Sequence, residues 1–324
     1  MLSVPYSKKL FGLIPWYSFL IVIGAAAAIL LAVREEKRAC LKKDTVIDFA
    51  LWVLPCGIIG ARIYYVVFSW SDFKNDLLSV FRIWEGGIAI YGAVIAGLLT
   101  AYIFSRKRKI SFFTLCDLIA PGLILAQAIG RWGNYFNQEC YGLPIQNPAL
   151  CFFPFGVQIE SESGLQWHMA TFFYESVWNL AVFVFLLVAR RKWFRYKGDV
   201  ICFYAFLYAC GRLIVEDFRT DSLYASSSVR ISQLLSVLIC FVILFRYWYV
   251  FREIVSLSVR LSIAFAFSAD LFLVLWMTGF FSFSFPVLGR FLVLLSASII
   301  NICTLLTLYG KCSQGDLIYA DVRS

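Results

Sequence analysis

Histidine, charge and nucleotide-binding signatures are scarce or missing in this sequence. It has one histidine among 324 residues, and only 15% of its residues are charged. A single histidine without clustered cysteines or carboxylates does not make a catalytic metal site, so we expect no metal and no cofactor. Neither a Walker A loop nor a dinucleotide fingerprint is present, so the sequence gives no indication of ATP or nicotinamide binding.

Polar linkers are missing as well, while long apolar runs recur along the whole chain. The composition is 61% hydrophobic with a mean hydropathy of +0.79, well above that of a soluble domain. A membrane-spanning helix needs about 20 mostly apolar residues, and the sequence supplies seven to nine such runs. The spans are expected to begin near Phe11, Asp48, Gly86, Leu115, Met169, Asp199 and Ile231, with two further runs near Leu261 and Pro286.

These runs predict an all-α, polytopic integral membrane protein. The first run has no small-residue cleavage site, so we interpret it as a retained helix rather than a signal peptide. The stretch after Glu253 differs in composition, because it has two Phe- and Leu-rich runs with few charges and a short polar tail. We therefore expect a seven-helix core over residues 1–252 and an appended two-helix hairpin over residues 253–324.

The formal net charge of +9 does not indicate nucleic acid, because the basic residues are confined to short loops on alternate sides of the spans. By the positive-inside rule, the basic loops after the first, third and fifth spans are cytoplasmic. The segment from Gly133 to Trp167 has no lysine or arginine and is expected outside, together with the amino terminus. An odd number of spans then puts the carboxyl terminus in the cytoplasm.

Ten cysteines do not make a disulfide framework here, because most of them fall inside apolar runs, where they act as small hydrophobes. Cys140 and Cys151 lie in the predicted outer loop, and the sequence leaves open whether they pair. The single His168 falls at the outer membrane boundary, where it is more typical of an interfacial polar residue than of a catalyst.

Ionisable residues inside or beside a membrane are costly and are therefore functional candidates. The first cluster is Gly130–Glu139, which ends an apolar span and carries Arg131, Asn134, Asn137 and Glu139. A guanidinium at headgroup depth can bind a lipid phosphate through two parallel donors. The alternative is an interfacial arginine that merely reaches toward water, with glycines that serve helix packing.

The second cluster lies late in the sixth span, where Tyr208, Arg212, Glu216 and Arg219 share one face at helical spacing. So much charge must face protein or water, and Arg212 with Glu216 is a natural intramembrane pair. A purely structural ion pair is the alternative.

Two further clusters are weaker. Glu85–Gly92 opens the third span and carries Tyr91, whose phenol can donate or accept a proton but is weakly basic. Tyr174–Asn179 opens the fifth span, and its Glu175 and Asn179 are explained by polar packing between helices as well as by catalysis.

In their order and residues, these clusters resemble the prolipoprotein diacylglyceryl transferase family. The family signature GRxGNFxNxExxG is written here GRWGNYFNQECYG from Gly130, and GAR at Gly60, GGIAIYG at Gly86, YESVWN at Tyr174 and the spaced YxxxRxxxExxR at Tyr208 follow the family pattern. The resemblance covers residues 11 to 250 and implies an enzyme of the bacterial cell membrane. It implies transfer of the diacylglyceryl group of phosphatidylglycerol to the lipobox cysteine of a prolipoprotein signal peptide, with release of glycerol 1-phosphate.

The resemblance also assigns roles. Arg131 and Arg212 are expected to hold the phosphate and steady its charge as the carbon–oxygen bond breaks. Tyr91 is the third residue expected to be catalytic, although it departs from the family pattern, which often has a histidine there that would activate the thiol. The two arginines could themselves supply much of the thiolate, so the identity of a general base stays open. Further positions expected to bind phosphatidylglycerol are Tyr17, Asn134, Asn137, Glu139, Tyr208, Glu216 and Arg219.

Two other functions remain open from the sequence. One is a transporter-like or non-catalytic lipid-binding protein of the same fold, against which the intact polar residues of the signature argue. The other is a transferase that uses the same donor with a different acceptor, since no motif reads the acceptor peptide.

Overall fold

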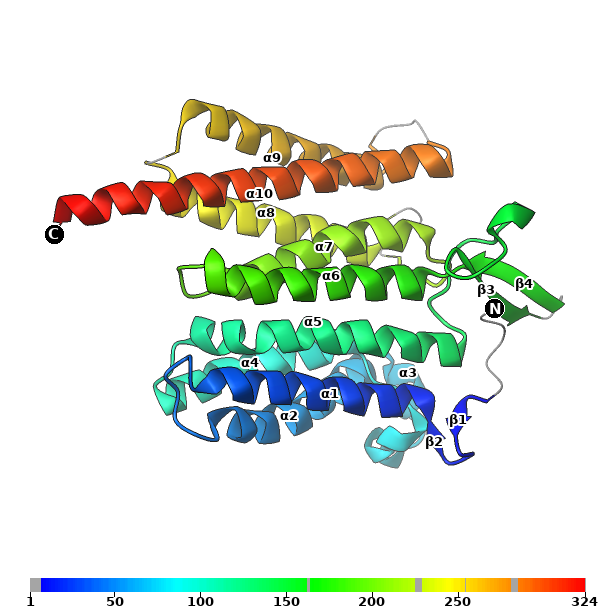
Figure 1. Ribbon diagram of the computed structural model, residues 1–324. Coiled ribbons are helices and arrows are strands. Elements are labelled where there is room, and N and C mark those ends of the chain that lie inside the picture. The colour runs from blue at the N-terminus through cyan, green and yellow to red at the C-terminus, as the bar shows by residue number, and fades with distance from the viewer. Residues whose placement is uncertain (1–6, 162–163, 225–228, 254, 281–284, 324) are drawn as a thin grey trace. The chain divides into compact units, whose positions relative to one another are not determined.

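The computed structural model describes residues 7–161, 164–224, 229–253, 255–280 and 285–323, apart from the side chains of Glu85 and residues 311–323 (Figure 1). In this part the chain is mostly helical, with nine long helices and one short one. The helices are α1 (Trp16–Glu36), α2 (Thr45–Phe68), α3 (Trp70–Phe73), α4 (Ile90–Arg108), α5 (Phe112–Asn137), α6 (Thr171–Lys192), α7 (Asp199–Phe218), α8 (Ile231–Phe251), α9 (Leu257–Met277) and α10 (Val287–Arg323).

Seven of the described helices are long and apolar enough to cross a membrane, which confirms a polytopic membrane protein. The two long helices that miss this criterion are α4 and α7. Helix α4 ends in Arg106, Lys107 and Arg108, and α7 includes the charged residues Arg212 and Glu216. The predicted starts of all nine long helices lie within a few residues of those observed.

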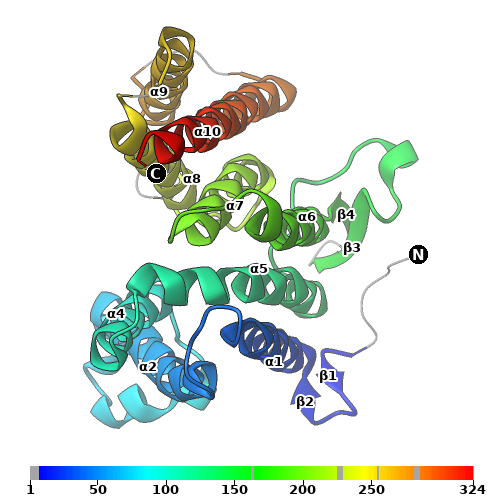
Figure 2. The same ribbon diagram turned by 60° about the vertical axis from the view of Figure 1, so that its left-hand side comes forward.

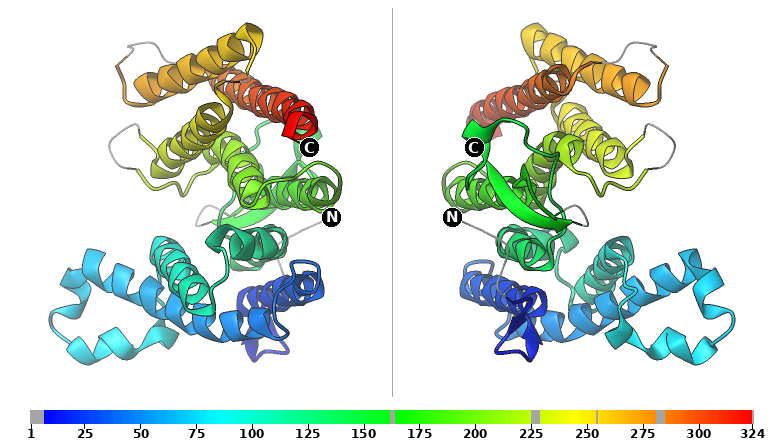
Figure 3. Two further views of the ribbon diagram at one scale, coloured as in Figure 1. Left: turned by 90° about the vertical axis from the view of Figure 1, so that its left-hand side faces the viewer. Right: turned by 90° about the vertical axis from the view of Figure 1, so that its right-hand side faces the viewer.

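Short strands and 3₁₀ turns occupy the connections, so the chain is not wholly α as expected. Strand β3 (Gly156–Ser161) pairs antiparallel with β4 (Gly164–Met169) beside the start of α6 (Figure 3). Val157 and Ile159 of β3 are both buried, as expected for a strand, in which every second side chain points to the same face. The remaining elements are β1 (Lys9–Leu10), β2 (Ile14–Pro15), η1 (Leu77–Phe81), η2 (Ile83–Glu85) and η3 (Pro148–Leu150).

The chain divides into two compact units, and the smaller one comprises residues 25–123 and 196–201. Within it, α2 and α4 cross closely because glycines meet: a Cβ on Gly60 would lie 2.8 Å from the carbonyl oxygen of Gly92. Arg62, two residues further along α2, is buried and donates to the backbone of the segment that joins α3 to α4. The GAR motif therefore organises this connection.

The larger unit comprises residues 1–24, 124–195 and 202–324, of which the described part includes α6 to α10. Helices α8, α9 and α10 lie side by side (Figure 2). Leu213 of α7, Val237 of α8, Leu273 of α9 and Leu294 of α10 form one buried apolar cluster. The two helices after residue 253 therefore pack on α7 and α8 rather than standing apart.

Candidate active site

A chain of alternating charges joins α5, α6 and α7 in the larger unit. Glu175 of α6 lies between two arginines: its Oε2 is 3.1 Å from Nε of Arg131, and its Oε1 accepts from Nη1 of Arg212 at 2.8 Å. The other terminal nitrogen of Arg212, Nη2, is 2.6 Å from Oε2 of Glu216. The chain continues through Arg219, whose Nη1 lies 3.8 Å from the same oxygen.

We call these residues, with Asp221 at the outer end, the charge chain: Arg131, Glu175, Arg212, Glu216, Arg219 and Asp221. Its three cations alternate with three anions, and Glu175 and Glu216 are only 4% and 2% exposed. An unpaired charge buried at low dielectric is strongly destabilising. Each carboxylate of the chain can stay ionised because an arginine lies beside it. Arg131, Glu175 and Arg212 lie four to six residues from the nearest helix end, about 6 to 9 Å along the axis.

Arg131 differs from its neighbours in how its donors are used. Its Nε makes the ion pair with Glu175, and its two terminal nitrogens have no partner among the residues that the structure describes. The preceding residue is Gly130, and apart from its chain neighbours and the backbone of its own helix, no described atom lies within 4 Å of the place that a Cβ there would occupy. The planar pair of donors that binds phosphate is therefore not used by the described residues at Arg131.

The polar residues of the signature form a local group of their own. Glu139 accepts from the side-chain amides of Asn134, at 2.8 Å, and Asn137, at 3.3 Å, and its backbone N–H donates to the carbonyl of Asn134. Gln138 and Cys140 adopt positive φ, so the chain turns sharply after α5 and brings Glu139 back to the helix. Arg131 is thus oriented by Glu175, while Glu139 is held by two amides.

Beyond the membrane-spanning part, Arg219 joins two loops. Its Nε and Nη2 donate to Asp221 at 2.9 and 3.0 Å, and Nη2 also lies 3.0 Å from Sγ of Cys140. Burial opposes ionisation of Asp221, but the hydrogen bonds from Arg219 outweigh it and lower the pKa of that carboxyl. Burial raises the pKa of the Cys140 thiol to about 12 despite Arg219, so this thiol stays protonated.

Two tyrosines expected at the site lie near the arginines. Tyr208, one turn before Arg212 on α7, interacts electrostatically with both Arg131 and Arg212. Tyr17 packs on the signature helix, since a Cβ on Gly133 would lie 2.7 Å from its ring. The structure therefore places both phenols beside the signature segment.

Tyr91 lies on α4 in the smaller unit, where its ring centre is 6.3 Å from that of Tyr64. The motif that carries it begins at Glu85, whose side chain is outside the described part. The activating role expected for this position stays a prediction.

Glu175 is a member of the charge chain that the sequence patterns do not place among the site residues. On spacing alone its alternative role, polar packing with Asn179, is equally good, and only the neighbouring helices show that it bridges two arginines. The signal that could have identified it is an ionisable residue in a span with no cation on its own helical face.

His168, Cys140 and Cys151 are the remaining polar candidates from the sequence. Nδ1 of His168 lies 2.8 Å from the carbonyl oxygen of Gly142 and its ring packs edge-on to Tyr141, as suits an ordered interfacial residue. Cys140 and Cys151 are both free thiols.

Comparisons with known proteins point to one family. A family model for prolipoprotein diacylglyceryl transferase matches residues 8–249. The phosphatidylglycerol–prolipoprotein diacylglyceryl transferase of Oceanobacillus iheyensis is 46% identical over 233 residues, which are 70% of this chain and 80% of that protein. The enzymes of the same name from Enterococcus faecalis and Streptococcus suis are 45% and 43% identical, over 71% and 69% of this chain and 84% and 83% of their own lengths. The chain therefore belongs to the prolipoprotein diacylglyceryl transferase family.

Proposed function

We propose that this chain transfers the sn-1,2-diacylglyceryl group of phosphatidylglycerol to the lipobox cysteine thiol of prolipoproteins, forming a thioether and releasing glycerol 1-phosphate. This is the first step of lipoprotein maturation. The observation that carries the proposal is the largely buried Arg131, whose terminal nitrogens are unpaired in the described part of the chain and which shares Glu175 with Arg212. Family membership and the names of the relatives support the same reaction.

The arginines serve the phosphate. In the reaction the cysteine sulfur attacks the glyceryl carbon next to the phosphate, the carbon–oxygen bond breaks, and its electron pair leaves on the phosphate oxygen. Arg131 binds that phosphate through its two terminal nitrogens, and Arg212 stabilises the growing charge from a position fixed by two carboxylates. Because these groups are oriented before the substrate arrives, little reorganisation is needed when the charge develops.

Activation of the acceptor thiol follows from the same charges. A cysteine thiol has an ordinary pKa of about 8.5, and nearby guanidinium groups favour the thiolate. The released proton goes to the phosphate of the leaving group or to water. The protein's own Cys140 does not compete with the substrate thiol as a nucleophile, because burial keeps Cys140 protonated. Tyr91 is then not required as a base.

We assign the phospholipid contacts to the residues around Arg131. Tyr208 and Tyr17 flank the phosphate, and Asn134, Asn137 and Glu139 shape the headgroup side of the signature turn. Glu216 and Arg219 hold Arg212 and the outer loop in place. The partners are phosphatidylglycerol and prolipoprotein signal peptides with a lipobox cysteine.

We further assign residues 1–252 to a seven-helix transferase core in the bacterial plasma membrane and residues 253–324 to an appended hairpin. The family match, which ends at residue 249, and the seven long helices α1, α2 and α4 to α8 support this division. The amino terminus lies outside and the carboxyl terminus in the cytoplasm, as the unbasic loop over residues 133–167 and the basic loops indicate.

The reaction is tested with the purified full chain in phosphatidylglycerol liposomes. We expect release of glycerol 1-phosphate and a mass gain of one diacylglyceryl group on a lipobox peptide, and neither with the same peptide carrying serine in place of cysteine. A plain thiol offered side by side separates acceptor classes. Release with the plain thiol but not with the peptide would contradict the proposed acceptor, and no release with either would contradict the transferase.

A further inference from the structure

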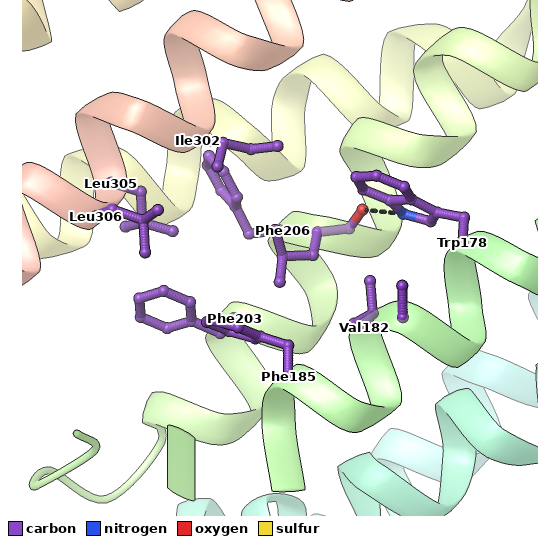
Figure 4. Close-up of a pocket in the computed structure, with 10 residues that line it drawn as sticks. Trp178, Val182, Phe185, Phe203, Phe206, Ile302, Leu305 and Leu306 are labelled. Atoms are coloured by element: carbon purple, nitrogen blue, oxygen red, sulfur yellow. Dashed lines mark hydrogen bonds between the residues drawn. The ribbon is translucent and has the colours of Figure 1, made fainter. Parts of the chain in front are cut away.

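An apolar groove lies between α6, α7 and α10 in the larger unit (Figure 4). It has a volume of about 250 Å³ and is lined by ten residues, all with apolar or aromatic side chains. Phe185 of α6, Phe203 of α7 and Ile302 and Leu306 of α10 converge on it. Its far wall thus comes from the hairpin, outside the region that matches the family.

Nothing polar is left in the groove for water or a headgroup to bind. The only polar side-chain atom in its lining is the indole nitrogen of Trp178, which donates to the carbonyl oxygen of Leu207 at 2.9 Å (Figure 4). An apolar cavity of about 150 Å³ already stays dry and binds a benzene-sized hydrocarbon, so this larger one suits a segment of hydrocarbon chain. Because Leu306 is 43% exposed and Ala181 is also exposed, a chain can enter from the bilayer.

The groove begins close to Glu175 of the charge chain. Trp178 stands three residues after Glu175 on α6, and its indole lies against α7 so closely that a Cβ on Gly211 would be 2.2 Å from its nitrogen. From Glu175 to Phe185 the helix advances ten residues, about 15 Å. This distance equals the thickness of the hydrocarbon region in one leaflet, about 15 Å, which is half of the bilayer's hydrocarbon core. A lipid whose phosphate is at Arg131 therefore has an acyl chain of the right reach for this groove.

We propose that the groove holds an acyl chain of the phospholipid donor, and that α10 of the appended hairpin forms one of its walls. The identity of the lipid as the donor rests on the proposed function. The hairpin then has a part in substrate binding: it covers the groove that α6 and α7 would otherwise leave open to bulk lipid.

The test uses phosphatidylglycerol with a photoreactive diazirine midway along one acyl chain, in liposomes with the full chain. We expect the label on the α10 peptide that includes Ile302 and Leu306. Ala181→Phe fills the groove and should remove this label. Because a long acyl chain then loses this apolar groove, KM should rise about tenfold for long-chain phosphatidylglycerol but not for a short-chain donor. Leu306→Trp, made from the opposite wall, should do the same.

The matched control is Val184→Phe, the same kind of enlargement on an exposed face of α6 outside the groove, which should leave both readouts unchanged. Labelling of α10 that persists in Ala181→Phe and Leu306→Trp, with KM unaltered, would overturn the groove while leaving the transferase intact. Equal labelling by phosphatidylcholine with the same photoreactive chain would overturn the donor assignment. A wild type that is labelled on α10 but releases no glycerol phosphate would overturn the proposed function and the donor assignment, and keep the groove.

Discussion

Arg62 and Arg131 both belong to motifs that the family resemblance singled out, and both are largely buried, yet their surroundings differ. A guanidinium has five N–H donors, and Arg62 donates to five backbone carbonyls, those of Ser79, Val80, Arg82, Gly86 and Gly87. Arg131 uses one nitrogen on Glu175 and leaves its terminal pair unengaged by the described residues. A motif arginine whose donors are filled by the protein builds structure, whereas one with donors left over is fit to bind a ligand.

The largest effect on stability should come from removing the saturated arginine. Arg62→Leu leaves five carbonyls without their donor, and we expect the free energy of unfolding to fall by about 3 kcal/mol or more. Thermal unfolding in detergent measures this, with Arg38→Leu, a mostly exposed arginine, as the control. An unchanged melting temperature would mean that Arg62 is not structural.

A smaller effect is expected at the carboxylate shared by the two site arginines. Glu175→Gln keeps the shape but removes the charge that orients Arg131 and Arg212, so kcat should fall about tenfold, or about 1.4 kcal/mol of transition-state stabilisation. Rates are normalised to folded protein, and Glu35→Gln, which removes the partner of the exposed Arg38, serves as the control. A variant with wild-type kcat would show that the orientation of Arg131 does not depend on Glu175.

Tyr91 tests whether the arginines need a partner base. Because the guanidinium groups already favour the thiolate, Tyr91→Phe should keep the rate within about twofold of wild type across the pH range. A loss of tenfold or more, with a changed pH profile, would assign the proton transfer to the phenol.

The smallest effect on stability is expected at Asp221, which accepts from Arg219, whose donors it shares with Cys140. The folded protein lowers the pKa of Asp221, so its stabilising contribution is present above the ordinary value of about 4 and is lost as pH falls through the lowered one. The melting temperatures of wild type and Asp221→Asn should therefore differ slightly at pH 7 and converge at low pH. A difference that does not shrink at all as the pH falls below about 4 would show that the carboxylate charge is not its cause.

The sequence predicted the helices better than the contacts between them. Apolar runs and the charges that end them placed every long helix, because these signals are local. The β3–β4 hairpin was missed, since its two-residue period is short and half of its residues are polar. Glu175 as the bridge between Arg131 and Arg212 depends on the packing of three helices distant in sequence, and the donors left free at Arg131 depend on which neighbours the fold brings near. No spacing rule contains that information.

The central claim is that Arg131 and Arg212 together bind and stabilise the phosphate of the donor. The most direct measurement is the initial rate of glycerol 1-phosphate release with a lipobox peptide in Arg131→Ala and Arg212→Ala, normalised to folded protein, with Arg38→Ala as the matched control. We predict a loss of about a hundredfold or more in each site variant, as expected when a donor to a developing charge is removed. Rates within about threefold of wild type in both well-folded variants would contradict the claim.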